Sequence, residues 1–324
     1  MKKVILAIAA VVALAACSNE ETLVESPREA IGFGNMFVEN STRATDGSYS
    51  STNLPESFKV YGTVTGNTTP ANTLNIFNGV DVYKTPQADD NIGDTGTWWY
   101  DKNFAQYWVP GASYNFAAVV GATVEDADKD EYDMPTKLTA VADTNMHFQD
   151  MLYNEVVVTG VDKNYKTPVA FNFEHLLSKV KFTATSNATG SYKHTISNIK
   201  VANYTDGAYT ISFDENGKLN GTWDATEGDV AFGGIEELTA AGVTCAYEKL
   251  LIPISDSFNV SFTVNTYNGT ELLTSEDFGP ITIDKDLVAG NAYNFQINCE
   301  LGLPITFTFG ALGDWGDDTS ISIP

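Results

Sequence analysis

Arginine is almost absent from this sequence. The chain of 324 residues has 18 basic residues, and only Arg28 and Arg43 are arginines. Both lie near the start of the chain, and no arginine follows Arg43. A general shortage of arginine in an acidic protein explains the low number but not the position of both residues. The distribution therefore needs a reason that is specific to the first part of the chain.

Positive charge of any kind is scarce. The 18 basic residues stand against 42 acidic ones, which gives a formal net charge of −24. Proteins that bind nucleic acid need a basic surface, because the phosphate backbone supplies most of the affinity. The composition therefore excludes a nucleic-acid binder. A charge of this size favours solubility and repels anionic surfaces.

Cysteine is also rare, with Cys17, Cys245 and Cys299 as the whole set. No pair has the spacing of a CxxC motif or of a zinc site. Cys245 and Cys299 could form one disulfide outside the cytoplasm. They could equally be buried thiols, since each alternates in register with apolar neighbours. Both alternatives stay open at this level.

The sequence offers few groups for catalysis. The three histidines have no metal-binding spacing, and there is neither a G-x-S-x-G motif nor a glycine-rich phosphate loop. Carboxylates are abundant, but no pair stands out as the acid and base of a glycosidase. We therefore expect a protein that is not an enzyme and that needs no cofactor or metal.

One acidic stretch, residues 125–133, resembles the start of a calcium loop. Asp126, Asp128 and Asp130 alternate as EF-hand ligands do, but the sixth position is Glu131 instead of glycine and the twelfth is Lys137 instead of glutamate. We expect a solvated acidic loop, with a weak calcium site as the alternative.

Long hydrophobic runs are missing except at the beginning. Lys2 and Lys3 precede an apolar run of thirteen residues, 4–16, which is too short to span a bilayer comfortably. The run ends in Leu-Ala-Ala followed by Cys17, the pattern of a bacterial lipobox. We therefore predict a lipoprotein signal peptide over residues 1–16 and a lipid on Cys17, which would anchor the chain to a membrane without spanning it. An ordinary secretory signal with an incidental cysteine is the alternative.

Alternating apolar and polar residues fill the rest of the chain. Clear examples are residues 57–64, 259–267, 292–301 and 303–310, with turn signals at Asn216-Gly217 and Asn268-Gly269. Alternation with period two, rich in β-branched and aromatic residues, is typical of half-buried strands. Only residues 174–180 and 233–242 could hold a short turn of helix. The sequence therefore predicts an all-β protein built from β-sandwiches.

The length favours two domains, because one sandwich takes roughly 100 residues. A turn-rich stretch around Tyr165 separates two strand-like runs. We predict an N-terminal sandwich over residues 44–165 and a C-terminal sandwich over residues 166–324.

An aromatic cluster lies between Trp98 and Trp108 and also includes Trp99, Tyr100 and Tyr107. We expect these rings to pack across the strands of a hairpin, as aromatic cross-strand pairs commonly do. The alternative is a platform that binds sugar, in which case the protein would be a surface lipoprotein that binds glycans.

Several stretches together resemble the precursors of fimbrillins, the subunits of type V pili. A lipobox, an apolar strand and an isolated arginine follow one another at the start. The later stretches are WWYDKNFAQYWVPGASYNFAAVV (98–120), VAFNFEHLLSKVKFTAT (169–185) and GNAYNFQINCELGLPITFTFGALGDW (290–315). The resemblance covers most of the chain, and the order of the motifs carries it more than any one of them.

The resemblance implies two tandem transthyretin-like β-sandwich domains after a lipoprotein signal peptide. It also implies export to the outer membrane as a lipoprotein, followed by cleavage by an arginine-specific protease. Residues 17–43 would then be a propeptide, with the cut between Arg43 and Ala44. We expect residues 30–39 to complete the first sheet through buried Ile31, Phe33 and Phe37, and to be the strand that cleavage removes.

In this family a strand from another subunit fills the groove that cleavage leaves, which is strand addition to an open sheet. A short apolar strand around Ile321 and Ile323 could be the donor, or it could be an ordinary edge strand. The expected partners are therefore other pilin subunits and the protease, and the expected final location is a surface pilus. The motifs do not separate stalk, tip and anchor subunits.

Overall fold

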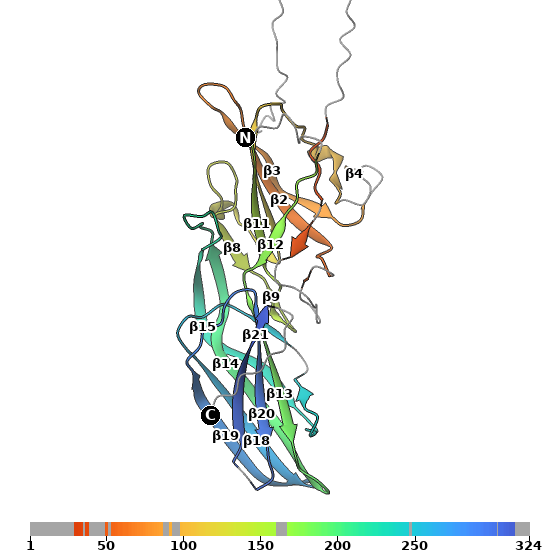
Figure 1. The fold of residues 1–324 in the computed structure, drawn as a ribbon, viewed down its shortest axis with the longest axis vertical. Helices are drawn as coiled ribbons and strands as arrows, with labels where there is room; N and C mark the ends of the chain where they lie inside the picture. Colours follow the sequence, from red (N-terminus) through yellow and green to blue (C-terminus); the bar gives the residue numbers. More distant parts are fainter. Residues whose placement is uncertain are drawn as a thin grey trace, which may run out of the picture.

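The structure is a computed structural model that describes residues 29–34, 36–38, 49–50, 53–86, 91–92, 98–159, 167–245, 248–302 and 304–314. For residues 91–92 and 307–314 it describes the backbone alone. Regular structure in these residues is almost entirely β-strand, which confirms the predicted all-β class. No helix within them is long and apolar enough to cross a membrane. The molecule is elongated, with the earlier strands in its upper half and the later strands in its lower half (Figure 1).

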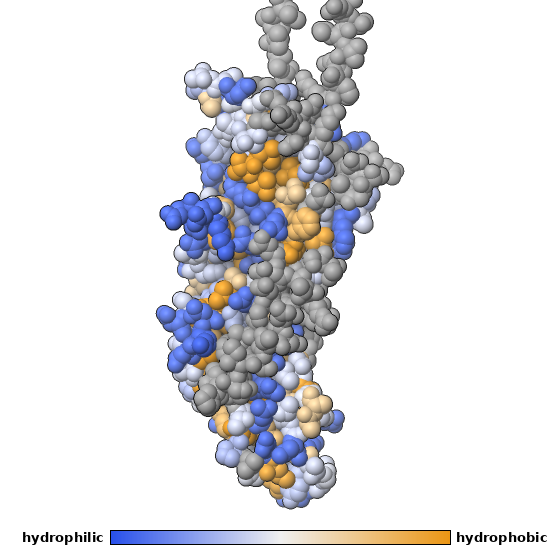
Figure 2. Space-filling view, viewed as in Figure 1, coloured by the Kyte–Doolittle hydropathy of each residue, from blue (hydrophilic) through white to orange (hydrophobic). Residues whose placement is uncertain are grey.

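The upper half is built on one mixed sheet of six strands. Their order is β1-β12-β11-β6-β2-β3, and only the pair β1–β12 is parallel. The strands are β1 (Phe37–Val38), β2 (Ser57–Thr65), β3 (Thr73–Tyr83), β6 (Ser113–Val120), β11 (Leu152–Val158) and β12 (Asn172–His175). In the view of Figure 2, apolar surface gathers over this half, around β2, β11 and β12.

The lower half is built on two sheets that pack face to face, and the second of them extends toward the upper half through β8 (Figure 1). One sheet has the order β16-β13-β20-β21, with β17 also paired to β13. Its strands are β13 (Ser178–Ser186), β16 (Val243–Thr244), β17 (Lys249–Leu251), β20 (Asn291–Cys299) and β21 (Thr306–Asp314). The other has the order β19-β18-β14-β8-β7, with β15 also paired to β14. Its strands are β7 (Ala122–Thr123), β8 (Lys137–Ala140), β14 (Tyr192–Thr210), β15 (Thr222–Ile235), β18 (Phe258–Asn268) and β19 (Glu271–Ile283).

Smaller elements connect these sheets. They are the two-stranded pairs β4 (Asn91–Ile92) with β5 (Tyr100–Asp101) and β9 (Ala142–Asp143) with β10 (His147–Phe148), and two 3-10 helices at Lys102–Phe104 and Asp126–Asp128. The two stretches that could have held a turn of helix, residues 174–180 and 233–242, are instead strand and irregular chain.

The alternating patterns lie where strands were predicted. In β18 the side chains of Val260, Phe262 and Val264 are buried, and β18 is followed by a tight turn at Gly269. A positive φ of 62° at Gly269 suits a residue without a Cβ. The period-two reading of the sequence is therefore correct in detail here.

The two cysteines of the lower half settle one open alternative. Cys245 and Cys299 are both buried within the second core and do not form a disulfide with each other. Burial raises the pKa of the Cys299 thiol to about 11. They behave as small apolar side chains and not as a disulfide.

Strands from each half pair with strands of the other half. The strand β12, which follows the predicted boundary near Tyr165, pairs with β11 and β1 in the upper sheet. In the other direction β8 pairs with the far end of β14 in the lower half. A third apolar cluster joins the halves and includes Tyr61, Leu176, Tyr209 and Leu250. The two-domain division at residue 165 stays a prediction.

Candidate functional site

The first described residues form a strand that closes the upper half. On one side, residues 29–33 run antiparallel to the segment 98–108. Three main-chain hydrogen bonds join them: Ile31 N to Gln106 O (2.8 Å), Trp98 N to Phe33 O (3.1 Å) and Trp108 N to Glu29 O (3.2 Å). Residues 29–33 and residues 98–108 thus satisfy main-chain groups that would be unpaired at an exposed strand edge.

On its other side the same strand runs parallel to residues 169–173. The hydrogen bonds are Val169 N to Gly32 O (2.8 Å), Gly34 N to Val169 O (2.9 Å) and Phe37 N to Phe171 O (2.9 Å). Further along, Phe37 and Val38 pair with residues 172–173 of β12. The described residues 29–34 and 36–38, an extended segment that ends in β1 and that we call the N-terminal strand, therefore lie between two segments that are far away in sequence.

The N-terminal strand completes a ring of main-chain pairing around the first core. Starting at β12, pairing runs through β11, β6 and β2 to β3. Tyr83 at the end of β3 then pairs with Trp99, with hydrogen bonds of 2.7 and 2.8 Å in the two directions. The segment 98–108 pairs with the N-terminal strand, which returns to β12. Removing this strand would open the ring at one place.

Phe33 is the centre of this arrangement. Its side chain has no exposed surface. Aromatic centroids surround it at 5.5–6.2 Å, and they belong to Phe58, Phe77, Tyr100, Phe116 and Phe171. Four of these contacts are edge-to-face and the contact with Phe171 is stacked, the geometries that ring quadrupoles favour.

Ile31 is held by both its side chain and its main chain. Its side chain is fully buried, and its carbonyl oxygen accepts a hydrogen bond of 2.7 Å from the Tyr100 hydroxyl. Burial raises the pKa of Tyr100 well above its usual range. The hydroxyl therefore keeps its proton over the whole physiological range and remains a donor to the strand.

The expectation that the side chain of Phe37 is buried is wrong. Its side chain is 58% exposed, whereas Met36 and Val38 are buried in the first core. Between Phe33 and Met36 the buried positions change from odd to even numbers. In a strand, a shift of one residue moves every following side chain to the opposite face. Ile31, Phe33, Met36 and Val38 are therefore the apolar anchors of the strand.

A buried polar group holds the chain shortly after the N-terminal strand. The Asp150 carboxylate accepts a hydrogen bond of 2.7 Å from the main-chain N–H of Tyr49. Its other oxygen lies 2.9 Å from Nδ1 of His175, and both side chains are completely buried. His175 belongs to β12, the strand that also pairs with Val38. The residues on either side of the segment 39–48 are thus fixed to neighbouring points of one sheet.

Several residues singled out in the sequence lie outside the described part of the chain. They are Cys17, Arg28, Arg43, Ala44, Ile321 and Ile323. The predicted roles of these residues stay predictions.

Three of the five rings of the aromatic cluster pack into the first core, as expected, whereas Trp99 is half-buried and Tyr107 is 45% exposed. Trp98, Tyr100 and Trp108 are buried, and Trp98 contacts Phe58 with ring centroids 5.1 Å apart. The ring centroids of Trp108 and Tyr114 are likewise 4.8 Å apart. The buried rings of the cluster support the N-terminal strand.

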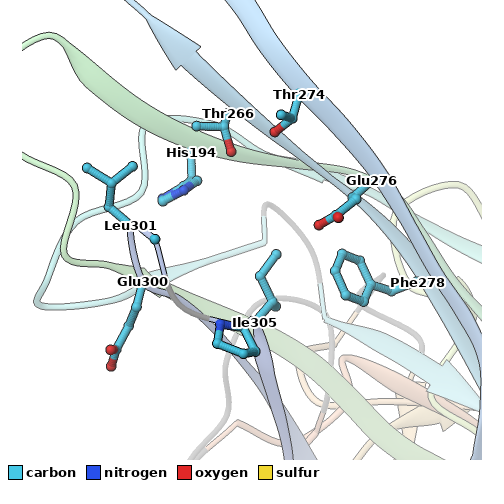
Figure 3. A pocket seen from close by; sticks show the side chains of 10 residues that line it. His194, Thr266, Thr274, Glu276, Phe278, Glu300, Leu301 and Ile305 are labelled. Carbon is cyan, nitrogen blue, oxygen red and sulfur yellow. The ribbon is translucent and has the colours of Figure 1, made fainter.

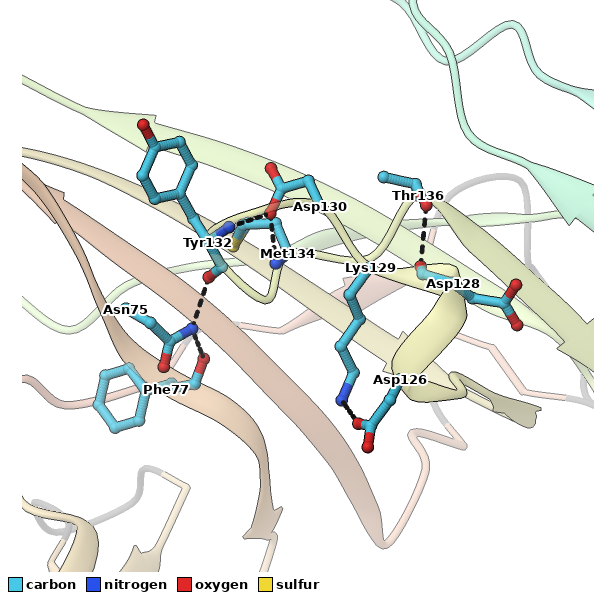
Figure 4. Close-up of polar contacts among 9 residues, drawn as sticks. All are labelled: Asn75, Phe77, Asp126, Asp128, Lys129, Asp130, Tyr132, Met134 and Thr136. Atoms are coloured by element: carbon cyan, nitrogen blue, oxygen red, sulfur yellow. Dashed lines mark hydrogen bonds and ion pairs between the residues drawn. The ribbon is translucent and has the colours of Figure 1, made fainter. Parts of the chain in front are cut away.

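The acidic stretch forms a compact loop whose polar groups bind one another (Figure 4). Asp130 accepts hydrogen bonds from the main chain of Tyr132 and Met134, and Asp126 pairs with Lys129 at 2.9 Å. Across the described residues, no three His, Cys, Asp or Glu side chains are arranged to hold a metal ion.

A cavity of about 490 Å³ lies near the lower end, beside the turn after β20 (Figure 3). His194 and Glu276 border it together with Phe278 and Ile305. Nδ1 of His194 lies 2.8 Å from the hydroxyl of buried Ser186, which also accepts from the main chain of Ala188. Burial lowers the pKa of His194. The serine oxygen is thus occupied by structural bonds, and the pair holds the end of β13 against β14.

Sequence reasoning missed the parts of the site that come from distant segments. The predicted boundary near Tyr165 assigns Phe171 and Phe173 to the second domain, and no sequence motif marks Tyr49 or Asp150. The only sequence signal for this pairing is the alternation of Val169, Phe171 and Phe173, which does not identify the partner strand.

The comparisons with known proteins agree with this architecture. A model of the family described as fimbrillin-like matches residues 42–315. A candidate cell adhesion protein from Bacteroides uniformis has a similar structure, with 16% identity, a TM-score of 0.52, and coverage of 90% of this chain and 99% of that chain. A fimbrial protein from Bacteroides vulgatus has 12% identity and a TM-score of 0.52, with coverage of 89% and 99%.

A candidate cell adhesion protein from Bacteroides ovatus gives 15% identity and a TM-score of 0.51, with coverage of 90% and 99%. At these identities the likeness is one of fold. No curated protein matches the chain. The family model covers most of the sequence, as the motifs predicted, and the chain belongs to the fimbrillin-like family.

Proposed function

We propose that this protein is a structural and adhesive subunit of a surface pilus and not an enzyme. Membership of the fimbrillin-like family supports this function. The fold likeness to the fimbrial protein from Bacteroides vulgatus agrees with it. Its partners are other pilin subunits, either in a polymer of identical subunits or in a mixed pilus.

The position of the N-terminal strand is the observation that carries the assembly mechanism. The strand closes a ring of main-chain pairing and fills the centre of the first core with Phe33. In our proposal it protects the groove in the precursor, and a strand from another subunit replaces it during assembly. This is strand addition to a sheet, in which main-chain hydrogen bonds give affinity and alternate side chains give specificity.

The strand should not leave the groove without help. Burial of a large apolar side chain stabilises a fold by roughly 1.5–3 kcal/mol, and Ile31, Phe33, Met36 and Val38 are all buried. The main-chain hydrogen bonds on both sides add to this. Exchange should therefore be slow until a donor strand competes for the groove.

The proposed cut between Arg43 and Ala44 falls between two fixed points, Val38 on β12 and Tyr49 on Asp150. Cleavage would break the covalent link between the N-terminal strand and the rest of the chain. Because no arginine follows Arg43, an arginine-specific protease would find no second arginine site in the mature subunit. This gives the arginine distribution a physical reason.

Before cleavage, in our proposal, the precursor is a lipoprotein of the outer membrane, acylated at Cys17. After cleavage the subunit enters the pilus. The C-terminal stretch with Ile321 and Ile323 is the proposed donor strand. These roles rest on the sequence and on the family resemblance.

N-terminal sequencing of the protein from the cell surface tests the processing step. We expect the assembled form to begin at Ala44 and the unassembled precursor to begin at Cys17. Radiolabelled palmitate should enter the wild type and not a Cys17→Ala variant. An assembled form that retains residues 29–38 would contradict the proposal.

A further inference from the structure

A second concave surface lies on the lower half, away from the N-terminal strand. It is a cavity of about 600 Å³ on the sheet formed by β18, β14 and β15, and we call it the β14 groove. In β14, Ile196 and Ile199 point into the second core, so that Thr195 and Ser197 lie on the opposite, outward face. The groove is therefore separate from the assembly site.

Small residues on β15 hollow out this surface. Ala231, Gly233 and Gly234 border the groove where longer side chains would otherwise cover β14. A Cβ on Gly233 would meet no atom within 4 Å, and its φ of +81° favours glycine. The pairing of β14 with β15 also shifts register between Ile196 and Ile199. Such a bulge bends a strand and re-aims its side chains.

The wall of the groove is a row of uncharged hydrogen-bonding groups. The Asn265 side-chain amide donates to Ser197 Oγ at 3.2 Å and to Thr195 Oγ1 at 3.5 Å. Its own oxygen accepts from Ser275 Oγ at 2.8 Å, which fixes the orientation of the amide. Because the two hydroxyl oxygens act as acceptors here, their hydrogens are available to donate outward.

An aromatic ring borders the same face. Tyr267 lies on β18 directly opposite Lys193 of β14, two positions beyond the pair of Asn265 with Thr195. The Lys193 ammonium lies 5.2 Å from the centre of the ring. The groove therefore combines a partly buried ring with hydroxyl and amide groups along one strand pair.

This lining selects the chemistry of a ligand. Glu236 and the acidic net charge of the chain disfavour an anion, while Lys200, which also borders the groove, lies 3.5 Å from a carboxylate oxygen of Asp229. A single carboxylate, Glu236, is too few for a metal ion. Hydroxyl and amide groups would remain unsatisfied against an apolar ligand. A neutral molecule with many hydroxyl groups and one apolar face satisfies all of them.

We propose that the β14 groove binds an uncharged saccharide. Tyr267 would pack the face of its ring that Lys193 leaves open against the C–H face of a sugar ring. Ser197, Thr195 and the exposed Asn198, which also borders the groove, would hydrogen-bond to the hydroxyl groups of the sugar. The site does not depend on strand exchange. It lies on the outward face of the β18-β14-β15 sheet, whereas the N-terminal strand belongs to the first core. It would give each subunit along a pilus its own contact with a neutral glycan.

Binding to a glycan array that carries neutral, sialylated and sulfated oligosaccharides tests the proposal. Wild-type protein should retain neutral glycans. Tyr267→Ala should weaken binding by roughly three- to tenfold, the ratio that corresponds to one aromatic contact. Ala231→Trp, which fills the groove from an exposed position, should abolish it. Tyr132→Ala, an exposed aromatic residue on the acidic loop, is the matched control and should bind as wild type.

Thermal melting of each variant separates loss of binding from loss of fold, and Ala231→Trp provides a second route if Tyr267→Ala is unstable. Absence of binding to every neutral glycan would overturn the proposal. Binding that is unchanged in a folded Ala231→Trp variant would also overturn it, as would retention of anionic glycans alone.

Discussion

The rings of Phe33 and Phe171 stack with centroids 6.0 Å apart and planes inclined by 22°. One ring belongs to the N-terminal strand and the other to the segment that leads into β12. Their stacking lies beside the main-chain pairs that join the two segments in parallel. The N-terminal strand is thus a structural member of the first core and not an extension lying on its surface.

Truncation of Phe33 should strongly destabilise the precursor. Phe33→Ala would leave a cavity among five aromatic rings, and such a change typically costs about 3–5 kcal/mol. Chemical denaturation of the precursor measures the change in the free energy of unfolding. Phe37→Ala is the matched control, because Phe37 is exposed, and it should alter the stability by less than about 0.5 kcal/mol. Equal losses for the two variants would contradict the assignment of the buried face.

The Asp150–His175 pair should hold the new N-terminal segment after the proposed cleavage. Asp150→Asn replaces one carboxylate oxygen with an NH2 group, which cannot accept the hydrogen bond from the Tyr49 amide or keep the contact with Nδ1 of His175. Leaving one buried partner without its hydrogen bond typically costs about 1–3 kcal/mol. Hydrogen–deuterium exchange of cleaved protein should show faster exchange at residues 49–50 in this variant. Glu215→Gln, on an exposed turn, should leave exchange at these residues unchanged, and an unchanged rate in Asp150→Asn would refute the role.

His194 should make the lower half less stable in mild acid. Burial lowers the pKa of His194 in the folded protein. In the unfolded chain the pKa of this imidazole is about 6.5, so the unfolded chain binds the proton more readily. The contribution of neutral His194 to the free energy of unfolding is therefore present above about pH 6.5. It is lost as the pH falls toward the lowered pKa of His194 in the folded protein. The stability gap between wild type and His194→Asn should narrow from about pH 7 to about pH 5. A gap that widens over this range would contradict the burial of a neutral imidazole.

The sequence predicted the local structure well because the signals for strands are local. Period-two alternation identified β18 and β20 together with their buried faces, and the Asn268-Gly269 pair identified a turn. The predicted burial of Ile31 and Phe33 is correct for the same reason. The prediction for Phe37 failed because a shift of one residue between Phe33 and Met36 leaves no clear sign in a short, strongly apolar stretch.

Long-range pairing could not be derived from the sequence. Nothing in the residues around Val169 indicates that they pair with residue 33 instead of with a strand of the second domain. The β14 groove arises from a bulge and from small residues on a neighbouring strand, and it too needs three-dimensional register. The Asp150–His175 pair joins two residues that have no distinctive spacing in the sequence.

Assembly by wild type and Arg43→Ala, compared on the cell surface, is the most direct test of the proposed maturation. The account predicts that Arg43→Ala reaches the surface, keeps its N-terminal strand and does not polymerise, whereas Arg28→Ala polymerises almost as wild type. Mild protease treatment should give a ladder of oligomers on electrophoresis for wild type and none for Arg43→Ala. If Arg43→Ala formed the same ladder as wild type, cleavage at this arginine would not be the step that opens the groove.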